Sequence, residues 1–192
     1  MTEQTVVLIK PDGVKRGIIG EVISKFEKVG LKIVSMKMIW VEKDVVGKHY
    51  ADKEDYLRSI GEKTLENYRK YGVDPHETLG TEDPLEIGRK VRQWNMEFMS
   101  SGPVVAMLLE APCVVEIVRK IVGSTFPQNA QPGTIRGDYS FDSAFYSNIG
   151  KRTTRNIVHA SGCVEEAKFE RELWFKEKDV YSYKTLAEIF FE

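Results

Sequence analysis

The chain has 192 residues, of which 42% are hydrophobic and 30% charged, and its formal net charge is −1. This balance predicts a soluble globular domain with a sizeable core, and the small net charge excludes broad attraction to nucleic acid or membranes. No apolar run approaches the ~18 residues of a membrane span. Because the polar start does not resemble a secretory leader and the two cysteines have no metal-like or disulfide-framework spacing, we expect a cytoplasmic protein.

The first part of the chain predicts two strands around a helix. Residues 5–9 are continuously apolar, which is typical of a buried strand, and the turn signal Lys10-Pro11-Asp12-Gly13 ends it. Apolar residues at helical spacing over 19–29 predict a helix. Over 34–40, apolar and polar residues alternate, so we expect a second strand with a stripe in the core formed by Val34, Met36, Met38 and Trp40.

The middle of the chain predicts two amphipathic helices. Apolar residues recur at helical spacing from Leu57 to Tyr71, and Asp83-Pro84 followed by Glu86 gives an N-cap, a first-turn proline and a capping-box partner for the second helix. We expect these helices to form an insertion over about residues 53–98 that packs on the core, so that residues 1–192 make one domain.

A buried strand over 104–109 and an apolar helix that ends at Gly123 follow. Residues 124–154 show no periodicity, and loops longer than ~12–15 residues are usually functional or disordered. Within them Arg136 stands between Gly133 and Gly137, where backbone amides and a guanidinium can approach an anion. Taken alone, a surface arginine in a mobile loop is the simpler explanation.

His159 follows a short apolar run, and Ser161-Gly162 separates it from an acidic helix. On that helix Glu170 shares a face with Ala167 and Leu173, so its carboxylate is predicted to point inward. A carboxylate on one ring nitrogen fixes the tautomer and frees the other nitrogen to attack. The alternatives are a structural histidine and a solvated glutamate.

Five motifs in order along the chain resemble nucleoside diphosphate kinases: residues 10–14 with Arg16-Gly17, His49-Tyr50, and residues 101–107, 132–138 and 156–161. The resemblance implies an α+β, ferredoxin-like fold with helices covering a four-stranded antiparallel sheet. It also implies reversible γ-phosphate transfer from a nucleoside triphosphate to a nucleoside diphosphate, by a ping-pong mechanism through a phosphohistidine at His159.

The resemblance also implies a role for each site residue. His159 would be the nucleophile, Glu170 would orient its ring, and Ser161 would contact that carboxylate. The others would bind the nucleotide: Lys10 at the γ-phosphate and sugar hydroxyl, Tyr50 in support of Lys10, Arg119 and Thr125 on the inner phosphates, Arg136 on the transferring group, and Asn156 on the sugar 3′ hydroxyl. Mg²⁺ would be carried by the phosphates, with no protein metal ligand.

The chain departs from the family pattern at several places. Ala160 and Gly162 replace the usual Gly and Asp, and that Asp normally lies near the metal. The insertion falls where the family places the aromatic residue that stacks on the base, for which Tyr56 and Trp94 are candidates, and the loop over about 139–154 is lengthened.

Besides nucleoside di- and triphosphates, the resemblance implies a homo-oligomer, expected to be a hexamer built from dimers, without membrane or specific nucleic-acid partners. The extra helices and the arginines at 152 and 155 favour an alternative, a non-catalytic nucleotide- or nucleic-acid-binding regulator on the same fold. The complete set of phosphate-handling residues favours the enzyme.

Overall fold

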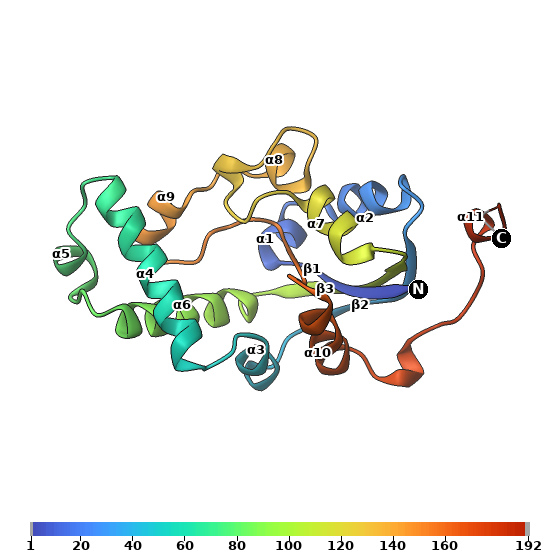
Figure 1. Cartoon of the computed structure of the whole chain (residues 1–192), viewed down its shortest axis with the longest axis horizontal. Helices are drawn as coiled ribbons and strands as arrows, with labels where there is room; N and C mark the ends of the chain where they lie inside the picture. The colour runs from blue at the N-terminus through green and yellow to red at the C-terminus, as the bar shows by residue number, and fades with distance from the viewer. Residues whose placement is uncertain (1, 191–192) are drawn as a thin grey trace.

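The computed structural model describes residues 2–190 and contains a four-stranded antiparallel sheet (Figure 1). The strand order is β2-β3-β1-β4. The strands are β1 (Glu3–Ile9), β2 (Lys32–Trp40), β3 (Pro103–Ala111) and β4 (Val158–Ala160). The predicted ferredoxin-like α+β fold is confirmed, with β1 and β3 in the centre of the sheet.

The central strands β1 and β3 carry buried residues on both faces of the sheet, since successive residues of a strand point to opposite sides. On one face Val7 and Met107 pack with α2 (Ile19–Glu27) and α7 (Val114–Val122). On the other face Leu8 and Leu108 pack with residues of α3 (Lys43–His49) and α10 (Val164–Trp174). The short helix α1 (Pro11–Lys15) directly follows β1, whereas η2 (Glu177–Asp179) and α11 (Leu186–Phe190) lie near the C-terminus.

The prediction that four side chains of β2 form a stripe in the core is wrong for three of them, which are exposed. These are Met36, Met38 and Trp40, at 53%, 56% and 67% exposure. The register with β3 shifts between Ile33 and Ser35, so that Val34 is an extra residue in a bulge. A one-residue shift exchanges the two faces of a strand. Val34 is therefore buried, while the later members of the stripe face outward.

Between β2 and β3 the chain forms α4 (Glu54–Lys70), α5 (Pro75–Leu79) and α6 (Pro84–Met99), which confirms the two predicted helices. The Asp83 carboxylate accepts the N–H of Leu85 and caps α6 as expected. Helices α4 and α6 approach so closely that a Cβ on Gly88 would lie 2.0 Å from the Leu57 carbonyl oxygen, and one on Gly61 would lie 1.8 Å from that of Pro84. Glycine is required at this crossing.

The segment over 124–154, where the sequence shows no periodicity, contains η1 (Pro127–Asn129), α8 (Ile135–Tyr139) and α9 (Ala144–Ile149). These helices are too short for an apolar repeat, and the hydroxyls of Thr134 and Ser143 cap the latter two. Helix α9 lies beside α4 (Figure 1), and the ring centroids of Tyr71 and Phe145 are 4.5 Å apart. No helix within residues 2–190 is long and apolar enough to cross a membrane.

Candidate active site

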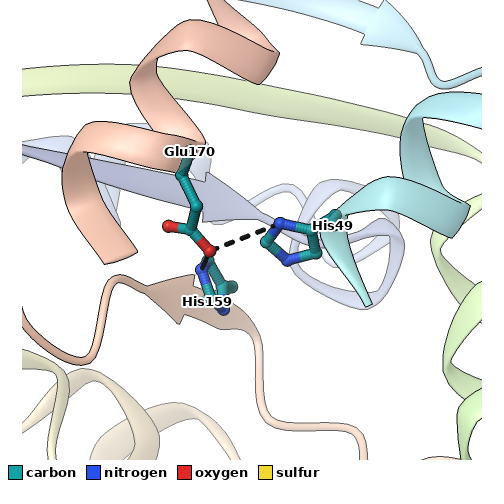
Figure 2. A group of neighbouring side chains, drawn as sticks. All are labelled: His49, His159 and Glu170. Atoms are coloured by element: carbon teal, nitrogen blue, oxygen red, sulfur yellow. Dashed lines mark hydrogen bonds and ion pairs between the residues drawn. The ribbon is translucent and has the colours of Figure 1, made fainter. Parts of the chain in front are cut away.

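The histidine in the middle of β4 forms a hydrogen-bonded pair with a buried glutamate of α10 (Figure 2). His159 Nε2 lies 2.6 Å from Glu170 Oε1, and the Ser161 hydroxyl donates to Glu170 Oε2 at 2.6 Å. Glu170 is only 2% exposed. Because a carboxylate accepts and does not donate, Nε2 carries the proton and Nδ1 keeps its lone pair.

The surroundings of this pair keep the imidazole neutral. Burial lowers the pKa of His159 far below its usual value, and the charge of Lys10 lowers it further. Burial also raises the pKa of Glu170. A neutral imidazole with one nitrogen held by a carboxylate and the other free is the form that can attack an electrophile.

A second histidine, for which the sequence predicts no role, lies against the pair (Figure 2). The ring of His49 meets that of His159 edge-on with centroids 4.5 Å apart, and its Nδ1 lies 3.3 Å from Glu170 Oε1. The indole N–H of Trp174 donates to the same Nδ1. Burial lowers the pKa of His49 to about 3, so its ring is neutral too. The signal that could have found it is its place beside Tyr50 in the second motif.

The turn after β1 holds the residue before β4 in a strained conformation. Ile157 has φ +69°, which is unfavourable for a β-branched residue. Its N–H donates to the Asp12 carboxylate at 3.0 Å, and its carbonyl accepts the backbone N–H of Lys10 at 2.8 Å. The first motif therefore fixes the direction in which the chain enters β4, and with it the position of His159.

Lys10 reaches the same region with its side chain. Its ammonium donates to Asn156 Oδ1 at 2.8 Å, and the Asn156 amide donates to the Thr125 carbonyl at 2.8 Å. Burial lowers the pKa of Lys10 to about 8, and the nearby charge of Arg136 contributes. Lys10 therefore remains a cation at neutral pH, although its amine binds the proton less tightly than that of an ordinary lysine.

Arg136 is buried, so the explanation of a surface arginine in a mobile loop is wrong. Its guanidinium donates to three backbone carbonyls, those of Gly123 at 3.0 Å, Asn156 at 3.3 Å and Val158 at 2.8 Å. Burial lowers the pKa of Arg136 to about 10, and the charge of Arg119 contributes. The three carbonyls hold the guanidinium rigidly in place.

The predicted nucleotide-binding residues meet in one cavity of about 320 Å³. Its lining includes Lys10, Tyr50, Arg119, Thr125, Arg136, Asn156 and His159. Ser161 and Glu170 are buried and are joined to His159 through the carboxylate. Within residues 2–190 no hydrogen bond joins the Tyr50 hydroxyl to Lys10, and burial raises the pKa of Tyr50.

The glycine that follows Ser161 has a carboxylate beside it. The Gly162 N–H donates to Glu166 Oε2 at 2.7 Å, and a Cβ added at 162 would lie 2.5 Å from that oxygen. The same Cβ would lie 3.7 Å from Arg119 Nη1. Glu166 therefore occupies the space that a larger residue at 162 would need.

A histidine that is held by a buried carboxylate and lines a small cavity together with cationic side chains, among them Lys10, Arg119 and Arg136, is an arrangement that suits phosphate transfer. The family model of "Nucleoside diphosphate kinase" matches residues 3–59 and 87–180. The chain belongs to the nucleoside diphosphate kinase family and is an enzyme, a phosphotransferase.

Individual relatives agree with this assignment. The chain is 47% identical over 178 residues to a nucleoside diphosphate kinase of Pyrobaculum aerophilum, which covers 93% of this chain and 97% of the relative. It is similar to the crystal structure of an NDP kinase from that organism, with a TM-score of 0.92, 44% identity and coverage of 95% and 100% of the two chains.

A second solved structure is a transition-state mimic of the Borrelia burgdorferi enzyme with bound vanadate and ADP. It has a TM-score of 0.78 and 33% identity, and the match covers 98% of this chain and 96% of that one. These relatives do not favour the alternative of a non-catalytic regulator.

Proposed function

We propose that the enzyme transfers the γ-phosphate of a nucleoside triphosphate to a nucleoside diphosphate through a phosphohistidine on Nδ1 of His159. The observation that carries this proposal is the 2.6 Å bond between His159 Nε2 and Glu170, because it leaves Nδ1 as the free nitrogen of a ring that lines the cavity. Bound ADP and vanadate in the Borrelia burgdorferi relative support the choice of substrate.

In the first half-reaction the Nδ1 lone pair attacks the γ-phosphorus, the bond from that phosphorus to the bridging oxygen breaks, and the diphosphate leaves with the electron pair. Glu170 stabilises the cationic ring that forms, since it accepts the Nε2 proton in a hydrogen bond. In the second half-reaction a terminal oxygen of another diphosphate attacks the phosphohistidine, and Nδ1 regains its lone pair. Phosphoryl transfer depends mainly on positioning and on charge stabilisation, which the cationic side chains supply.

Each remaining side chain has a place in this scheme. Lys10 and Arg136 contact the transferring group, Arg119 and Thr125 the inner phosphates, and Asn156 the sugar 3′ hydroxyl. Tyr50 acts as a buried support on the same cavity wall. Both aromatic candidates for the base line the cavity, but Trp94 also packs against the insertion cluster, whereas Tyr56 is 47% exposed and is freer to stack on a base.

The cofactor that we propose is Mg²⁺, which enters with the phosphates. Among the described residues, the group close enough to share a metal is His49, His159 and Glu170, and its two nitrogens do not suit Mg²⁺. Glu166, whose carboxylate accepts the Gly162 N–H, would be the acidic side chain to contact a metal-bound water, in place of the aspartate that the family usually has at 162. The chemistry that Mg²⁺ supplies when bound is neutralisation of phosphate charge.

The test is the intact mass of the protein after mixing with ATP and Mg²⁺. We expect a gain of one phosphate group that acid removes, and the loss of that gain and of turnover in His159→Ala. The matched control is His76→Ala, since His76 is an exposed residue of α5 and should keep both. An adduct that persists in His159→Ala would refute the proposal.

We also propose a homo-oligomer, a hexamer built from dimers, in which the edge of β2 forms a contact between copies. Its support is the exposed apolar stripe on this edge strand, formed by Met36, Met38 and Trp40. Met38→Lys should give a smaller particle by light scattering at equal concentration. An unchanged mass would exclude this edge as the contact.

The domain organisation that we propose is one domain over residues 1–192, elaborated at about 53–98 and 139–154. The family model leaves residues 60–86 unmatched, which supports an insertion there.

The location that we propose for the protein is the reducing cytoplasm. The two cysteines are free and exposed, which fits this location.

A further inference from the structure

A cationic side chain of α6 contacts the end of α3, which carries His49 and Tyr50. Arg92 Nε donates to the Tyr50 carbonyl at 2.8 Å, and Arg92 Nη2 donates to the Gly47 carbonyl at 3.0 Å. The third nitrogen, Nη1, lies 3.7 Å from a carboxylate oxygen of Asp52, and the Arg92 side chain is 19% exposed. All three nitrogens of this guanidinium therefore face oxygens of one short stretch of chain.

Helix α3 is too short to fix its own C-terminal end. It has seven residues, and the last carbonyls of a helix have no hydrogen-bond donor within that helix. An arginine at this end binds such carbonyls and opposes the negative end of the helix dipole. The chain leaves the helical conformation at Tyr50, where φ is −93° and ψ is 94°. Arg92 thus holds both the last turn of α3 and the residue at which the chain changes direction.

The end of α3 forms one side of the His159–Glu170 pair. Figure 2 shows His49 pointing from this end toward Glu170, whose Oε1 lies 3.3 Å from His49 Nδ1 and also holds Nε2 of His159. The rings of the two histidines meet edge-on. A shift of the α3 end would therefore change how the nucleophile is oriented, and a misplacement of about 1 Å can lower a reaction rate on the order of 10²-fold.

Arg92 is carried by a helix that is fixed at its C-terminal end. Helix α6 ends at Met99, which is fully buried in the core on this face of the sheet, and β3 begins shortly afterwards at Pro103. Helix α6 also lies directly against α3, since a Cβ on Gly47 would be 3.5 Å from the methyl carbon of Met96. Because α6 is anchored in the core, its arginine is a firm support for the end of α3.

We propose that Arg92 is a positioning residue for the phosphotransfer reaction, because it holds the end of α3, and through it His49, against Glu170 and His159. This inference rests on the proposed function, since it takes His159 as the nucleophile. Arg92 acts without touching the substrate: it lines a different cavity, of about 460 Å³, together with Lys43 of α3.

The first variant to measure is Arg92→Ala, because the two carbonyls that it binds belong to the backbone and cannot be removed by substitution. We expect kcat to fall about tenfold while KM for both nucleotides stays within about twofold, since the side chains that contact the substrate are unchanged. Steady-state kinetics give this split between kcat and KM. The rate of phosphoenzyme formation, followed by intact mass after rapid mixing with ATP and Mg²⁺, should fall with kcat.

Rescue by a small cation separates positioning from general damage to the fold. The truncated side chain leaves a space next to the 460 Å³ cavity, which a guanidinium ion can enter to donate to the same carbonyls. Guanidinium chloride at millimolar concentration should restore most of the lost kcat in Arg92→Ala, whereas sodium chloride at the same concentration should not. A variant that is merely less stable would lose activity instead, because guanidinium is a denaturant.

Two further variants serve as controls. Arg89 lies on the same helix and lines the same cavity, but it is exposed and makes no hydrogen bond or ion pair within residues 2–190. Arg89→Ala should keep its kcat and should not respond to guanidinium. Asp52→Asn removes only the longer contact of Arg92 with a carboxylate that is 67% exposed, and it should change kcat by less than about twofold.

A kcat in Arg92→Ala within about twofold of that of the unmodified enzyme would overturn the inference, as would a loss that guanidinium does not restore or that Arg89→Ala shares. If Arg92→Ala does not fold, Arg92→Lys decides the question, because it keeps the charge but cannot bind both carbonyls, and an unchanged kcat would then overturn the inference. If the unmodified enzyme forms the phosphohistidine while Arg92→Ala keeps its kcat, the positioning role alone is wrong. Absence of the phosphohistidine from the unmodified enzyme would instead refute the proposed function.

Discussion

The sheet core of this enzyme and the segment α4–α6, which we propose to be an insertion, are held together in different ways. The central strands carry fully buried residues on both faces, so each of them packs against two layers of helices. The insertion depends on a cluster of four buried residues and on the glycine-mediated crossing of α4 and α6. Regions with fewer buried apolar contacts open at lower free energy. The residues proposed for chemistry therefore lie on the firmly packed part, and those proposed for the base lie partly on the weaker one.

The strongest way to test the core is to change Glu170 to Gln. Ser161 would then donate to the amide oxygen, and the amide nitrogen would face Nε2 of His159, which forces the ring proton onto Nδ1 and blocks the nucleophile. We expect kcat to fall on the order of 10³-fold with little change in KM. Steady-state kinetics measure this, and a fall of less than tenfold would show that Glu170 does not set the tautomer.

A smaller effect should follow from pH. The pKa of Lys10 is lowered to about 8, so Lys10 is a cation below that pH and loses its charge as the pH rises through it. One pH unit above this pKa, kcat/KM should be about tenfold below its plateau. In Lys10→Arg the plateau should be lower, but this limb should disappear because arginine stays charged. A limb that is unchanged in Lys10→Arg would assign it to another group.

The smallest effect is expected in the insertion. In Gly88→Ala the new Cβ must push the Leu57 carbonyl away, which should destabilise the crossing by about 2 kcal/mol. Hydrogen exchange should speed up in α4 and α6 but not in β1 and β3, and KM should rise a few-fold while kcat stays within about twofold. Gly20→Ala is the control, since a Cβ there meets nothing within 4 Å. Equal acceleration in both regions would mean that they unfold as one unit.

The convergence of distant residues could be predicted from the sequence, because the motifs that contain Lys10, Arg136 and His159 occur in a fixed order, and these three side chains line one cavity. The helical spacing that turns Glu170 inward could be predicted too, and Glu170 is buried against His159. The roles of these residues stay predictions. What the motifs do not contain is register: the bulge at Val34 reverses the faces of β2, and alternation alone gives the period of a strand and not which side is buried.

Contacts between segments that are distant along the chain could not be predicted from the sequence either. The bond between Thr153 and Asn95 joins two regions that no sequence repeat or spacing connects, and His49 gains its position against Glu170 only once α3 and α10 pack on the same face of the sheet. Pairwise geometry of this kind depends on tertiary packing, to which a local pattern of residues is insensitive.

The left-handed backbone of Ile157 has a consequence for attempts to make this enzyme more heat-resistant. Glycine would relieve the positive φ at this position, but Ile157 is only 2% exposed and packs in the main core, so loss of its side chain should cost several kcal/mol, more than the strain that is removed. Glycine would also free the chain at the point where it delivers the nucleophile to the cavity. Position 157 is thus one at which a strained backbone has to be kept, because both the core and the reactive histidine depend on the side chain that causes the strain.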